Sequence, residues 1–357
     1  MTIRILITRH SSRNSRASAS GRRGFHSGSW LPASVALPGF VFVAASLLYG
    51  QQGNIAGPSA GFVFDNTSHV LRGIRGIPGA SLIGDPVDFG FEAAWVSVSP
   101  ALDSALVADA TGDIHVFQLN GGKSAERTID GLAAARHVVF SPSGTAAALY
   151  GAGGVQILNG LPDAPAIAGS LTLGQDSSPQ FGAASLGGRR RSMGEPLAVS
   201  DDGGYLLLVS GGGLRILGIA GDNRKLTDAS AGTLAAFALG GHDVVVMDPE
   251  TGLALIHDAA GASVQQPLAG LESHIGLPVA VAFSPDGQKV FVASATARKV
   301  TAVDVATSAS TTLACDCAPI GLVRMGSVFR LNEFGAGPLW LLDAKTDPRL
   351  VFVPAMQ

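Results

Sequence analysis

Charged and aromatic residues are scarce in this sequence of 357 residues. Asp, Glu, Lys and Arg make up 14% and aromatic residues 6%, while apolar residues reach 46%. An intrinsically disordered chain is excluded, because such chains are highly charged and poor in apolar residues. Glycine occupies 47 positions, which argues against a helical bundle, because each glycine inside a helix costs about 1 kcal/mol relative to alanine.

The sequence also lacks the common motifs of cofactor and metal sites. Its glycine runs at 151–154 and 211–213 lie between apolar runs, whereas a phosphate-binding loop requires a following helix N-terminus. The eight histidines form no H-x-H or H-E-x-x-H pattern. Acidic pairs such as Asp109 with Asp113 flank glycine-containing turns without the spacing of a calcium loop. We therefore expect no cofactor and no bound metal ion.

Only two cysteines occur, Cys315 and Cys317, separated by one residue. Side chains two residues apart point to the same side of an extended strand, so a bond between them closes a small, strained ring. Three interpretations remain open from the sequence: a local disulfide in an oxidising compartment, two free thiols packed in a loop, or a redox or metal-binding pair.

The net charge of −3 is the sum of two unlike regions. Residues 1–24 hold six arginines and no acidic residue, which leaves 18 basic against 27 acidic residues, a net charge of −9, in the remainder. No charged residue occurs at 24–64, and an apolar run occupies 31–49. A basic segment followed by an apolar one is typical of an export signal. We predict a leader at 1–52 and an exported protein, either periplasmic, cell-surface or secreted.

Two other interpretations of the leader remain. The apolar run nearly reaches the ~20 residues that span a bilayer, so 31–49 also fits a retained membrane anchor. Pro32 and Pro38 interrupt the run, and no A-x-A cleavage pattern precedes Gln51. A basic tail on a cytoplasmic scaffold therefore stays as a third interpretation.

A short phrase recurs along the rest of the chain. It reads VSP at 98–100, FSPSG at 140–144, VSDDG at 199–203 and FSPDG at 283–287, with a degenerate copy, FALGG, at 237–241. The anchors are the serines and, in the degenerate copy, Leu239. Each phrase precedes two further apolar runs, most of them joined by a Gly- or Asp-containing turn. Four short strands in each repeat of about 40–45 residues predict a β-propeller.

These units resemble the YVTN and WD-repeat-like family of β-propeller repeats. The similarity covers about residues 60–357 and is strongest at 283–307, which reads FSPDGQKVFVASATARKVTAVDVAT. The fourth unit departs from the family pattern, with FALGGHD in place of the SPDG turn, and no unit carries a WD dipeptide. The resemblance implies the propeller fold, which serves lactonases, dehydrogenases, lyases and pure scaffolds alike.

We expect one all-β domain at 60–357, a propeller of six or seven four-stranded blades. Six complete units lie between residues 91 and 354, and an extra strand pair at 62–65 and 70–74 resembles the outer half of a blade. This pair either closes the ring as a seventh blade or caps its edge, because an open ring leaves strand edges unpaired. The segment at about 174–194 is predicted to be an inserted loop.

Ionisable residues near the starts of innermost strands are the candidates for an active site. They are Glu92, Arg136, His137 and Glu195. These residues come from different blades. Their side chains either meet at the mouth of the central channel, as an acid–base or binding site requires, or cap the ends of their strands and lie in solvent. No charged position recurs from blade to blade, which argues against a ring of metal or cofactor ligands.

The densest basic cluster of the acidic body is Arg189, Arg190 and Arg191, within the predicted loop. It is a candidate contact for a protein or carbohydrate partner, although a solvated loop has the same composition. Nucleic acid is an unsuitable partner, because a body of net charge −9 repels phosphates and has no basic stripe interleaved with aromatic residues. We expect a monomer that contacts membranes only through its N-terminal segment.

Two functions are consistent with these features. The first is an exported, non-catalytic propeller that binds a protein or ligand through the loops of one face. The second is an exported propeller enzyme, such as a lactonase, hydrolase or quinoprotein-like oxidoreductase, with the four ionisable candidates at the channel mouth. Convergence of those side chains in one pocket favours the enzyme, and their scatter around the rim favours the scaffold.

Overall fold

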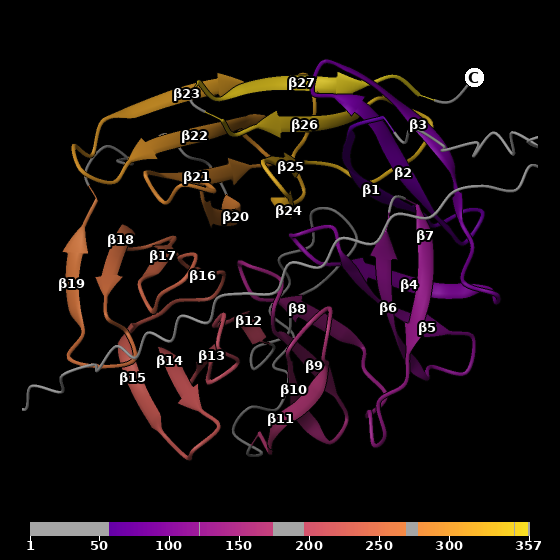
Figure 1. Cartoon of the computed structure of the whole chain (residues 1–357). Coiled ribbons are helices and arrows are strands. Elements are labelled where there is room, and N and C mark those ends of the chain that lie inside the picture. The colour runs from indigo at the N-terminus through magenta and orange to yellow at the C-terminus, as the bar shows by residue number, and fades with distance from the viewer. Residues whose placement is uncertain (1–56, 121, 174–195, 269–277, 346, 356–357) are drawn as a thin grey trace, which may run out of the picture. The chain divides into compact units, whose positions relative to one another are not determined.

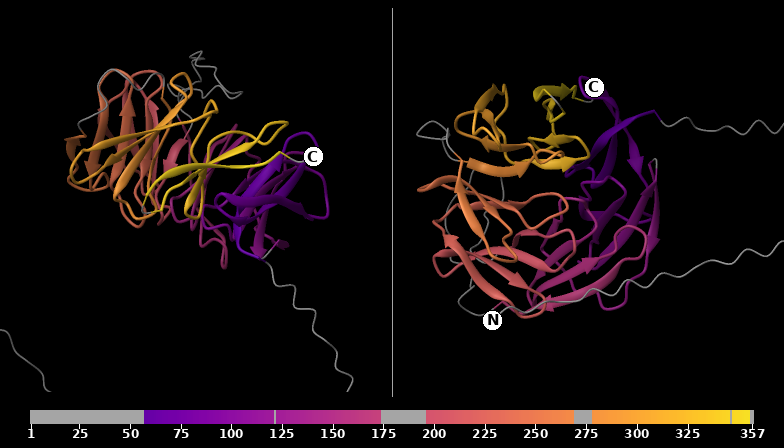
Figure 2. Two further views of the ribbon diagram at one scale, coloured as in Figure 1. Left: turned by 90° about the horizontal axis from the view of Figure 1, so that it is seen from above. Right: turned by 60° about the vertical axis from the view of Figure 1, so that its left-hand side comes forward.

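The computed structural model describes residues 57–120, 122–173, 196–268, 278–345 and 347–355. These residues form 27 β-strands and no helix, in seven antiparallel sheets arranged as the blades of a propeller (Figures 1 and 2). The predicted all-β propeller is confirmed, and the number of blades is seven. The predicted leader at 1–52 and the inserted loop lie outside the described residues.

Each blade is one uninterrupted stretch of chain, and consecutive strands within it are hydrogen-bonded neighbours. Blade 1 has three strands, β1 (Ser59–Asp65), β2 (Val70–Ile77) and β3 (Ala80–Val87). Blades 2 to 7 have four strands each. Their innermost strands surround the central axis (Figure 1). These are β4 (Ala93–Val98), β8 (His137–Phe140), β12 (Pro196–Val199), β16 (Leu234–Phe237), β20 (Pro278–Phe283) and β24 (Val323–Met325).

The remaining strands follow outward from the axis. The second strands are β5 (Ser104–Asp109), β9 (Ala147–Gly151), β13 (Tyr205–Ser210), β17 (Val244–Asp248), β21 (Lys289–Ser294) and β25 (Val328–Arg330). The third strands are β6 (Ile114–Asn120), β10 (Gly154–Asn159), β14 (Gly213–Gly218), β18 (Gly252–His257), β22 (Lys299–Asp304) and β26 (Leu339–Asp343). The outermost strands are β7 (Lys123–Arg127), β11 (Ala166–Leu171), β15 (Asn223–Asp228), β19 (Val264–Pro267), β23 (Ser310–Ala314) and β27 (Arg349–Val353).

The recurring serine phrase forms the turn between the innermost and second strands. Ser284 is buried; its backbone N donates to Lys289 O at 2.8 Å, and its Oγ accepts from Lys289 N at 2.9 Å. Its Oγ also donates to Asp286 Oδ1 at 2.6 Å. Gly287 completes the turn by donating to Ser284 O at a φ of +71°, a conformation that favours glycine. The phrase is therefore a folding element that satisfies the turn's backbone groups.

Three blades form this turn differently, and in blade 7 only Gly326 and Ser327 lie between the paired residues Met325 and Val328. In blade 5 the backbone N of Ala238 donates to Asp243 O at 2.8 Å, so Ala238 takes the place of the serine. The sequence-based choice of Leu239 as the anchor of this repeat is thus wrong by one residue. In blade 2 the glycine position is taken by Leu102, which has a φ of +65° and donates to Ser99 O.

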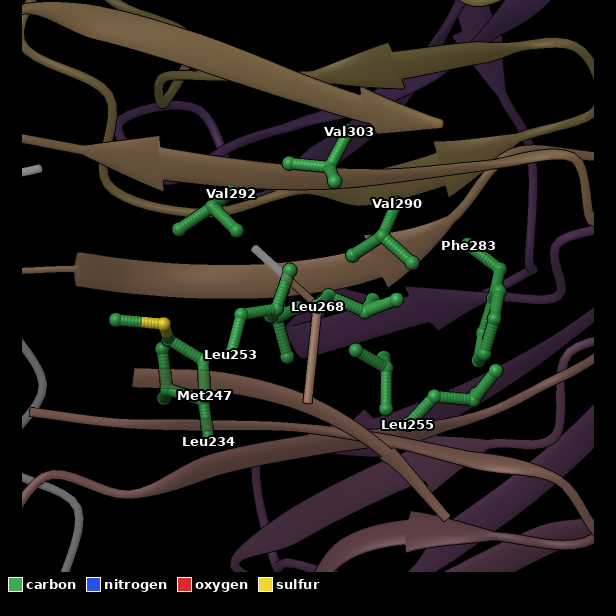
Figure 3. Close-up of a cluster of buried hydrophobic side chains, with 11 residues drawn as sticks. Leu234, Met247, Leu253, Leu255, Leu268, Phe283, Val290, Val292 and Val303 are labelled. Carbon is green, nitrogen blue, oxygen red and sulfur yellow. The ribbon is translucent and has the colours of Figure 1, made fainter. Parts of the chain in front are cut away.

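The core consists of apolar layers between neighbouring blades. Figure 3 shows the layer between blades 5 and 6, in which Met247 of β17 lies in one cluster with Val290 and Val292 of β21. Val245 of β17 belongs to the same cluster. Val246 of β17 points the other way, into the layer shared with blade 4. Alternate side chains of a strand face opposite sides of the sheet, and here both sides are covered. This explains why the second strands read as continuous apolar runs in the sequence.

Within the described residues, blade 1 lacks the innermost strand that the other blades have. Asp65 ends β1 by accepting from Thr67 N at 2.9 Å, as Asp109 at the end of a second strand accepts from Thr111 N at 2.8 Å. Residues 60–64 of β1 are all buried, as in second strands. The predicted strand pair therefore belongs to the second and third strands of blade 1, rather than to the outer half, and β3 was missed.

Blades 7 and 1 close the ring by packing alone. Val63 and Ile74 of blade 1 lie in one buried cluster with Met325, Val328 and Leu341 of blade 7. No strand ladder joins the two sheets in the described residues. The two blades approach closely, since a Cβ added to Gly61 would lie 2.5 Å from Met325 Sδ. Between blades 7 and 1, the closure that a propeller requires is thus made by side-chain packing.

Candidate functional site

The turns between innermost and second strands converge at one mouth of the central channel. Asp201 in blade 4 accepts hydrogen bonds from the N and Oγ of Ser143 in blade 3, both at 2.6 Å. Its other oxygen accepts from Gly240 N in blade 5 at 2.7 Å. With three donors already bound, this carboxylate is not placed to act as a general base. Its geometry is that of a link between three blades.

An arginine from blade 7 reaches the same mouth. Arg324 donates from Nη1 to Pro142 O of blade 3 and from Nε to Gly326 O, both at 3.1 Å. Burial lowers the pKa of its guanidinium, and the nearby charge of Asp201 opposes that shift. Beside it, Gly326 N donates to Pro100 O of blade 2 at 2.7 Å, so blades 7 and 2 meet directly across blade 1.

We call this set the inner-turn network: Pro100, Pro142, Ser143, Asp201, Gly240, Arg324 and Gly326. Its residues were not among the candidates predicted from the sequence. Two signals were available: the lone arginine in the apolar strand that ends in Met325, and the extra aspartate of the VSDDG phrase. Neither signal reveals which blades the side chains join, because their partners are up to 182 residues away.

The predicted active-site residues lie at the starts of innermost strands. They are therefore at the mouth of the central channel opposite to the inner-turn network. Glu92 directly precedes β4, and Arg136 directly precedes His137, the first residue of β8. Glu92 and Arg136 are exposed, while His137 is half-buried. In the described part of the chain, no hydrogen bond or ion pair joins the side chains of Glu92 and Arg136. Glu195 lies outside the described residues, so the catalytic assignment stays a prediction.

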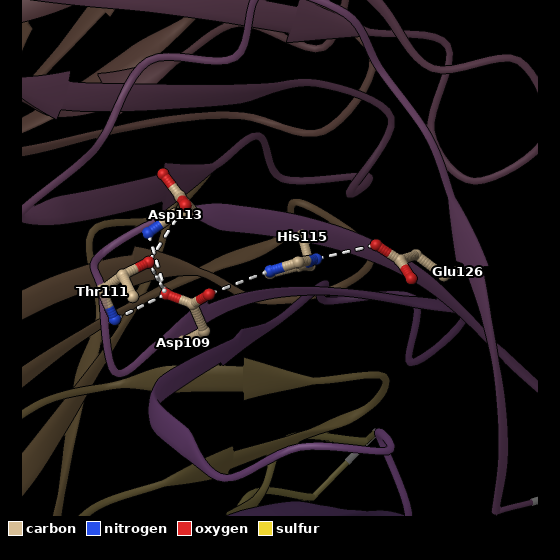
Figure 4. A network of polar contacts seen from close by, with 5 residues as sticks. All are labelled: Asp109, Thr111, Asp113, His115 and Glu126. Atoms are coloured by element: carbon tan, nitrogen blue, oxygen red, sulfur yellow. Dashed lines mark hydrogen bonds and ion pairs between the residues drawn. The ribbon is translucent and has the colours of Figure 1, made fainter.

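A polar cluster on blade 2 surrounds His115 (Figure 4). Its Nδ1 lies 2.7 Å from Glu126 Oε1, and its Nε2 lies 3.5 Å from Asp109 Oδ2. Burial alone would lower the pKa of His115, but the two carboxylates together raise it above its ordinary value. The hydrogen bond from the Thr111 hydroxyl is the main cause that lowers the pKa of Asp109 to about 2. The two carboxylates of the cluster therefore favour the protonated form of the imidazole that lies between them.

The carboxylate of Asp248, at the end of β17, also has a structural role. It is buried, and its Oδ2 accepts from the Thr233 hydroxyl at 2.5 Å and from Ser230 N at 2.7 Å. Its Oδ1 accepts from Glu250 N and Thr251 N. Burial would raise the pKa of Asp248, but these hydrogen bonds together lower it far below its usual range. The carboxylate thus stabilises the turn between β17 and β18.

Cys315 and Cys317 are joined by a disulfide, which is one of the three arrangements left open by the sequence. Both residues are buried in a cluster with Phe291, Phe329 and Leu331 between blades 6 and 7. The bond lies in the loop between β23 and β24. Their assignment as a redox pair stays a prediction.

One catalytic pattern occurs in the sequence without its structural context. Residues 57–61 read GPSAG and match the G-x-S-x-G nucleophile pattern. That motif places its serine on a strand-to-helix turn, whereas Ser59 opens β1 and its hydroxyl donates to Gly61 O at 3.3 Å. The described chain around Ser59 is thus not a nucleophile elbow.

The described residues contain neither a candidate metal site nor a membrane-spanning helix. No group of three or more His, Cys, Asp or Glu side chains there is arranged as a metal site. No helix there has the length and apolarity needed to cross a membrane. The three predicted loop arginines, Arg189 to Arg191, lie outside these residues.

Comparison with known proteins shows similarity of fold. No protein-family model matches the sequence, and no curated protein matches it. A structure of Kuenenia stuttgartiensis hydrazine synthase is similar with a TM-score of 0.51 and 13% identity, over 80% of this chain and 92% of that chain. A functionally unknown protein from Desulfotomaculum acetoxidans DSM 771 has a TM-score of 0.51 and 11% identity, over 83% and 99% of the chains. The chain is thus a seven-bladed β-propeller protein, and its relation to the YVTN and WD-repeat-like family stays a prediction.

Proposed function

We propose that this chain is an exported, non-catalytic propeller of the YVTN and WD-repeat-like type that serves as a binding scaffold for a protein or carbohydrate partner. One structural observation carries the scaffold proposal. The innermost strands of blades 2 to 7 include only two ionisable side chains, His137 and Arg324. Arg324 is bound to carbonyl oxygens of two turns. The other polar clusters described above likewise hold turns and blades together.

The export proposal is supported by the sequence. Residues 1–24 carry six arginines and no acidic residue, and the uncharged apolar run at 31–49 follows them. A positive segment before an apolar one is the arrangement that export machinery recognises. The propeller is either released after this segment or held at a membrane by it. The disulfide of Cys315 and Cys317 is compatible with an oxidising compartment.

The location is tested by cell fractionation together with N-terminal sequencing of the isolated protein. We expect the protein in the envelope or the medium. A cytoplasmic protein that begins at Thr2 contradicts export.

The partner is tested by capture from envelope fractions and by binding to purified surface polysaccharides. We expect one saturable partner. Replacement of Arg189, Arg190 and Arg191 by alanine is expected to weaken binding if the partner is anionic, because it removes three positive charges from an otherwise acidic body. The matched control replaces Arg349, which lies on the outermost strand of blade 7.

A propeller enzyme is the second candidate, because Glu92 and Arg136 open the innermost strands of neighbouring blades on the same face. Lactone and ester substrates are the probes. Activity that is lost in both Glu92→Gln and His137→Gln, with folding unchanged, supports an enzyme and contradicts the scaffold proposal. Equal background hydrolysis by the wild type and both variants supports the scaffold.

A further inference from the structure

The disulfide of Cys315 and Cys317 joins no separate parts of the chain. Both cysteines lie in the loop between β23 and β24, and the ring that the bond closes includes one further residue, Asp316. A disulfide stabilises a fold mainly by restricting the unfolded chain, and this effect is smallest for the shortest loops. Blades 6 and 7 are held together by the buried cluster that contains both cysteines. A structural role therefore does not account for this disulfide.

The loop that carries the bond passes from blade 6 to blade 7 between two anchoring hydrogen bonds. Cys315 N donates to Arg298 O of blade 6 at 2.9 Å, and Ile320 N donates to Leu331 O of blade 7 at 2.8 Å. Cys317 lies in the segment between these anchors. Cys315 is thus fixed to blade 6, whereas displacement of a few residues is enough to move Cys317.

The segment between the anchors has one face toward solvent. Asp316 and Ala318 are exposed, whereas Cys315 is 5% and Cys317 is 8% exposed. The disulfide lies under the loop, against the cluster of blades 6 and 7 that includes Phe329. An attacking group therefore reaches the sulfur atoms when this short segment moves, without separation of the blades.

The two sulfur atoms of the bond are not equivalent. Cys317 N donates a hydrogen bond of 3.3 Å to Cys315 Sγ. A hydrogen bond to a charged group favours its charged form, so this contact favours the thiolate of Cys315. Thiol–disulfide exchange is faster when the leaving sulfur is the more stable thiolate. Cys315 is therefore the leaving sulfur, and Cys317 is the sulfur that is attacked.

We propose that Cys315 and Cys317 form a thiol–disulfide exchange site whose reductant is a dithiol, such as a protein with two neighbouring thiols. One thiolate of the dithiol attacks Cys317 Sγ; a mixed disulfide forms, the bond between the two cysteines breaks, and Cys315 leaves as a thiolate. The second thiolate of the dithiol then attacks its own sulfur in the mixed disulfide and releases Cys317. Two electrons pass from the dithiol, which becomes a disulfide, and its two protons end on Cys315 and Cys317.

This inference goes beyond the proposed scaffold function. One exchange for each chain sets the oxidation state of the pair without turnover of a substrate, so a non-catalytic propeller can carry the site. An oxidising compartment, as the export proposal supplies, keeps the pair in the disulfide form. The test below is made on the isolated protein and depends neither on its location nor on its binding partner.

The test measures reduction of the folded, full-length chain by dithiothreitol. Samples are quenched with acid and blocked with N-ethylmaleimide, and mass spectrometry counts the thiols in each chain. We expect two thiols per chain, because both cysteines are in the disulfide. The rate should not change when urea is added below the unfolding transition, and oxidised glutathione should restore the bond. A rate that rises with urea, as for reduction through global unfolding, overturns the inference.

Two single variants form a matched pair that tests the order of attack. Cys315→Ala leaves only the thiol of Cys317, and Cys317→Ala leaves only that of Cys315. With oxidised glutathione, we expect Cys315→Ala to form the mixed disulfide on the order of tenfold faster, because access to the sulfur controls exchange. Circular dichroism checks that both variants are folded. Equal rates overturn the assigned order of attack, and if either variant does not fold, the wild-type measurement alone decides.

Discussion

Asp201 and Ser143, 58 residues apart in the sequence, are joined by two hydrogen bonds of 2.6 Å that tie blade 4 to blade 3. The same carboxylate binds Gly240 N of blade 5. Each blade is a separate sheet, so hydrogen bonds between blades are few and concentrated in such turns. We therefore expect Asp201 to contribute more to stability than its place in a surface turn suggests.

Replacement of Asp201 by alanine leaves the backbone amides of Ser143 and Gly240 without their acceptor. We expect the free energy of unfolding to fall by about 2–4 kcal/mol, measured by urea denaturation. Asp130→Ala is the control, because Asp130 is exposed, and it should change stability by less than about 0.5 kcal/mol. Equal effects of the two substitutions would contradict the linking role of Asp201.

Ser284→Ala tests the role of the recurring serine. The substitution removes the acceptor of Lys289 N and the donor to Asp286, so we expect a loss of about 1–3 kcal/mol in the free energy of unfolding. Ser310→Ala at an exposed position of β23 serves as the control. Ala238→Ser makes the converse change, because it introduces the hydroxyl that the turn of blade 5 lacks. If Ala238→Ser raises the free energy of unfolding while Ser284→Ala lowers it, the result supports the same turn structure in blades 5 and 6. The proposal fails if Ser284→Ala leaves the unfolding midpoint unchanged.

His115 is expected to titrate above its ordinary pKa of about 6.5. Because the folded pKa is the higher one, the contribution of protonated His115 to stability is complete below pH about 6.5 and disappears as the pH rises through the folded pKa. Glu126→Gln should lower the titration midpoint, because it removes one carboxylate. NMR of histidine-labelled protein gives the midpoint directly. Glu333→Gln, in blade 7, should leave it unchanged, and a wild-type midpoint below 6.5 rules the prediction out.

Gly61→Ala should weaken the closure of the ring. The added methyl group meets Met325 Sδ at 2.5 Å, and Gly61 has a φ of +145°. We expect a loss of about 1–3 kcal/mol, as for other overpacked core positions. In the double variant with Met325→Ala, part of the loss should be recovered, since the methyl then fills the space. Gly241→Ala is the neutral control, because an added Cβ at Gly241 meets only open space. If the changes in the free energy of unfolding caused by Gly61→Ala and Met325→Ala are strictly additive, the contact between the two residues is disproved.

Thiol counting tests the bond between Cys315 and Cys317. We expect no reactive thiol in protein denatured without reductant, and two per chain after reduction, because both cysteines are in the disulfide. The assay is a colorimetric thiol titration of protein isolated under conditions that block exchange. Two free thiols before reduction would refute the bond.

The strands were predictable from the sequence because each second strand is covered on both faces. The apolar run at 244–247, for example, matches β17, whose residues pack alternately against blades 4 and 6. The serine phrase marked the turns because one buried hydroxyl satisfies groups five residues away, which is a local interaction. Local hydrogen bonds within a turn, and burial of a strand on both faces, can therefore be recognised from the amino-acid sequence.

The number of blades and the inner-turn network were not predictable in the same way. Blade 1 differs from the repeat because its second strand is the innermost one described, and the burial of β1 together with the contact between Pro100 and Gly326 reveals this. Arg324 finds its acceptor on a turn 182 residues away. A contact of this kind depends on ring closure, which no segment of sequence encodes alone.

The packed junction of blades 1 and 7 has a mechanical consequence. The first and last described strands belong to the two blades that meet there, and no strand ladder crosses between these sheets in the described residues. A force applied to the two ends of the chain therefore acts directly on this junction. Every blade is one continuous stretch of chain. Under such a force we therefore expect the ring to open at this junction first, and the blades then to separate and unfold one after another from the two ends.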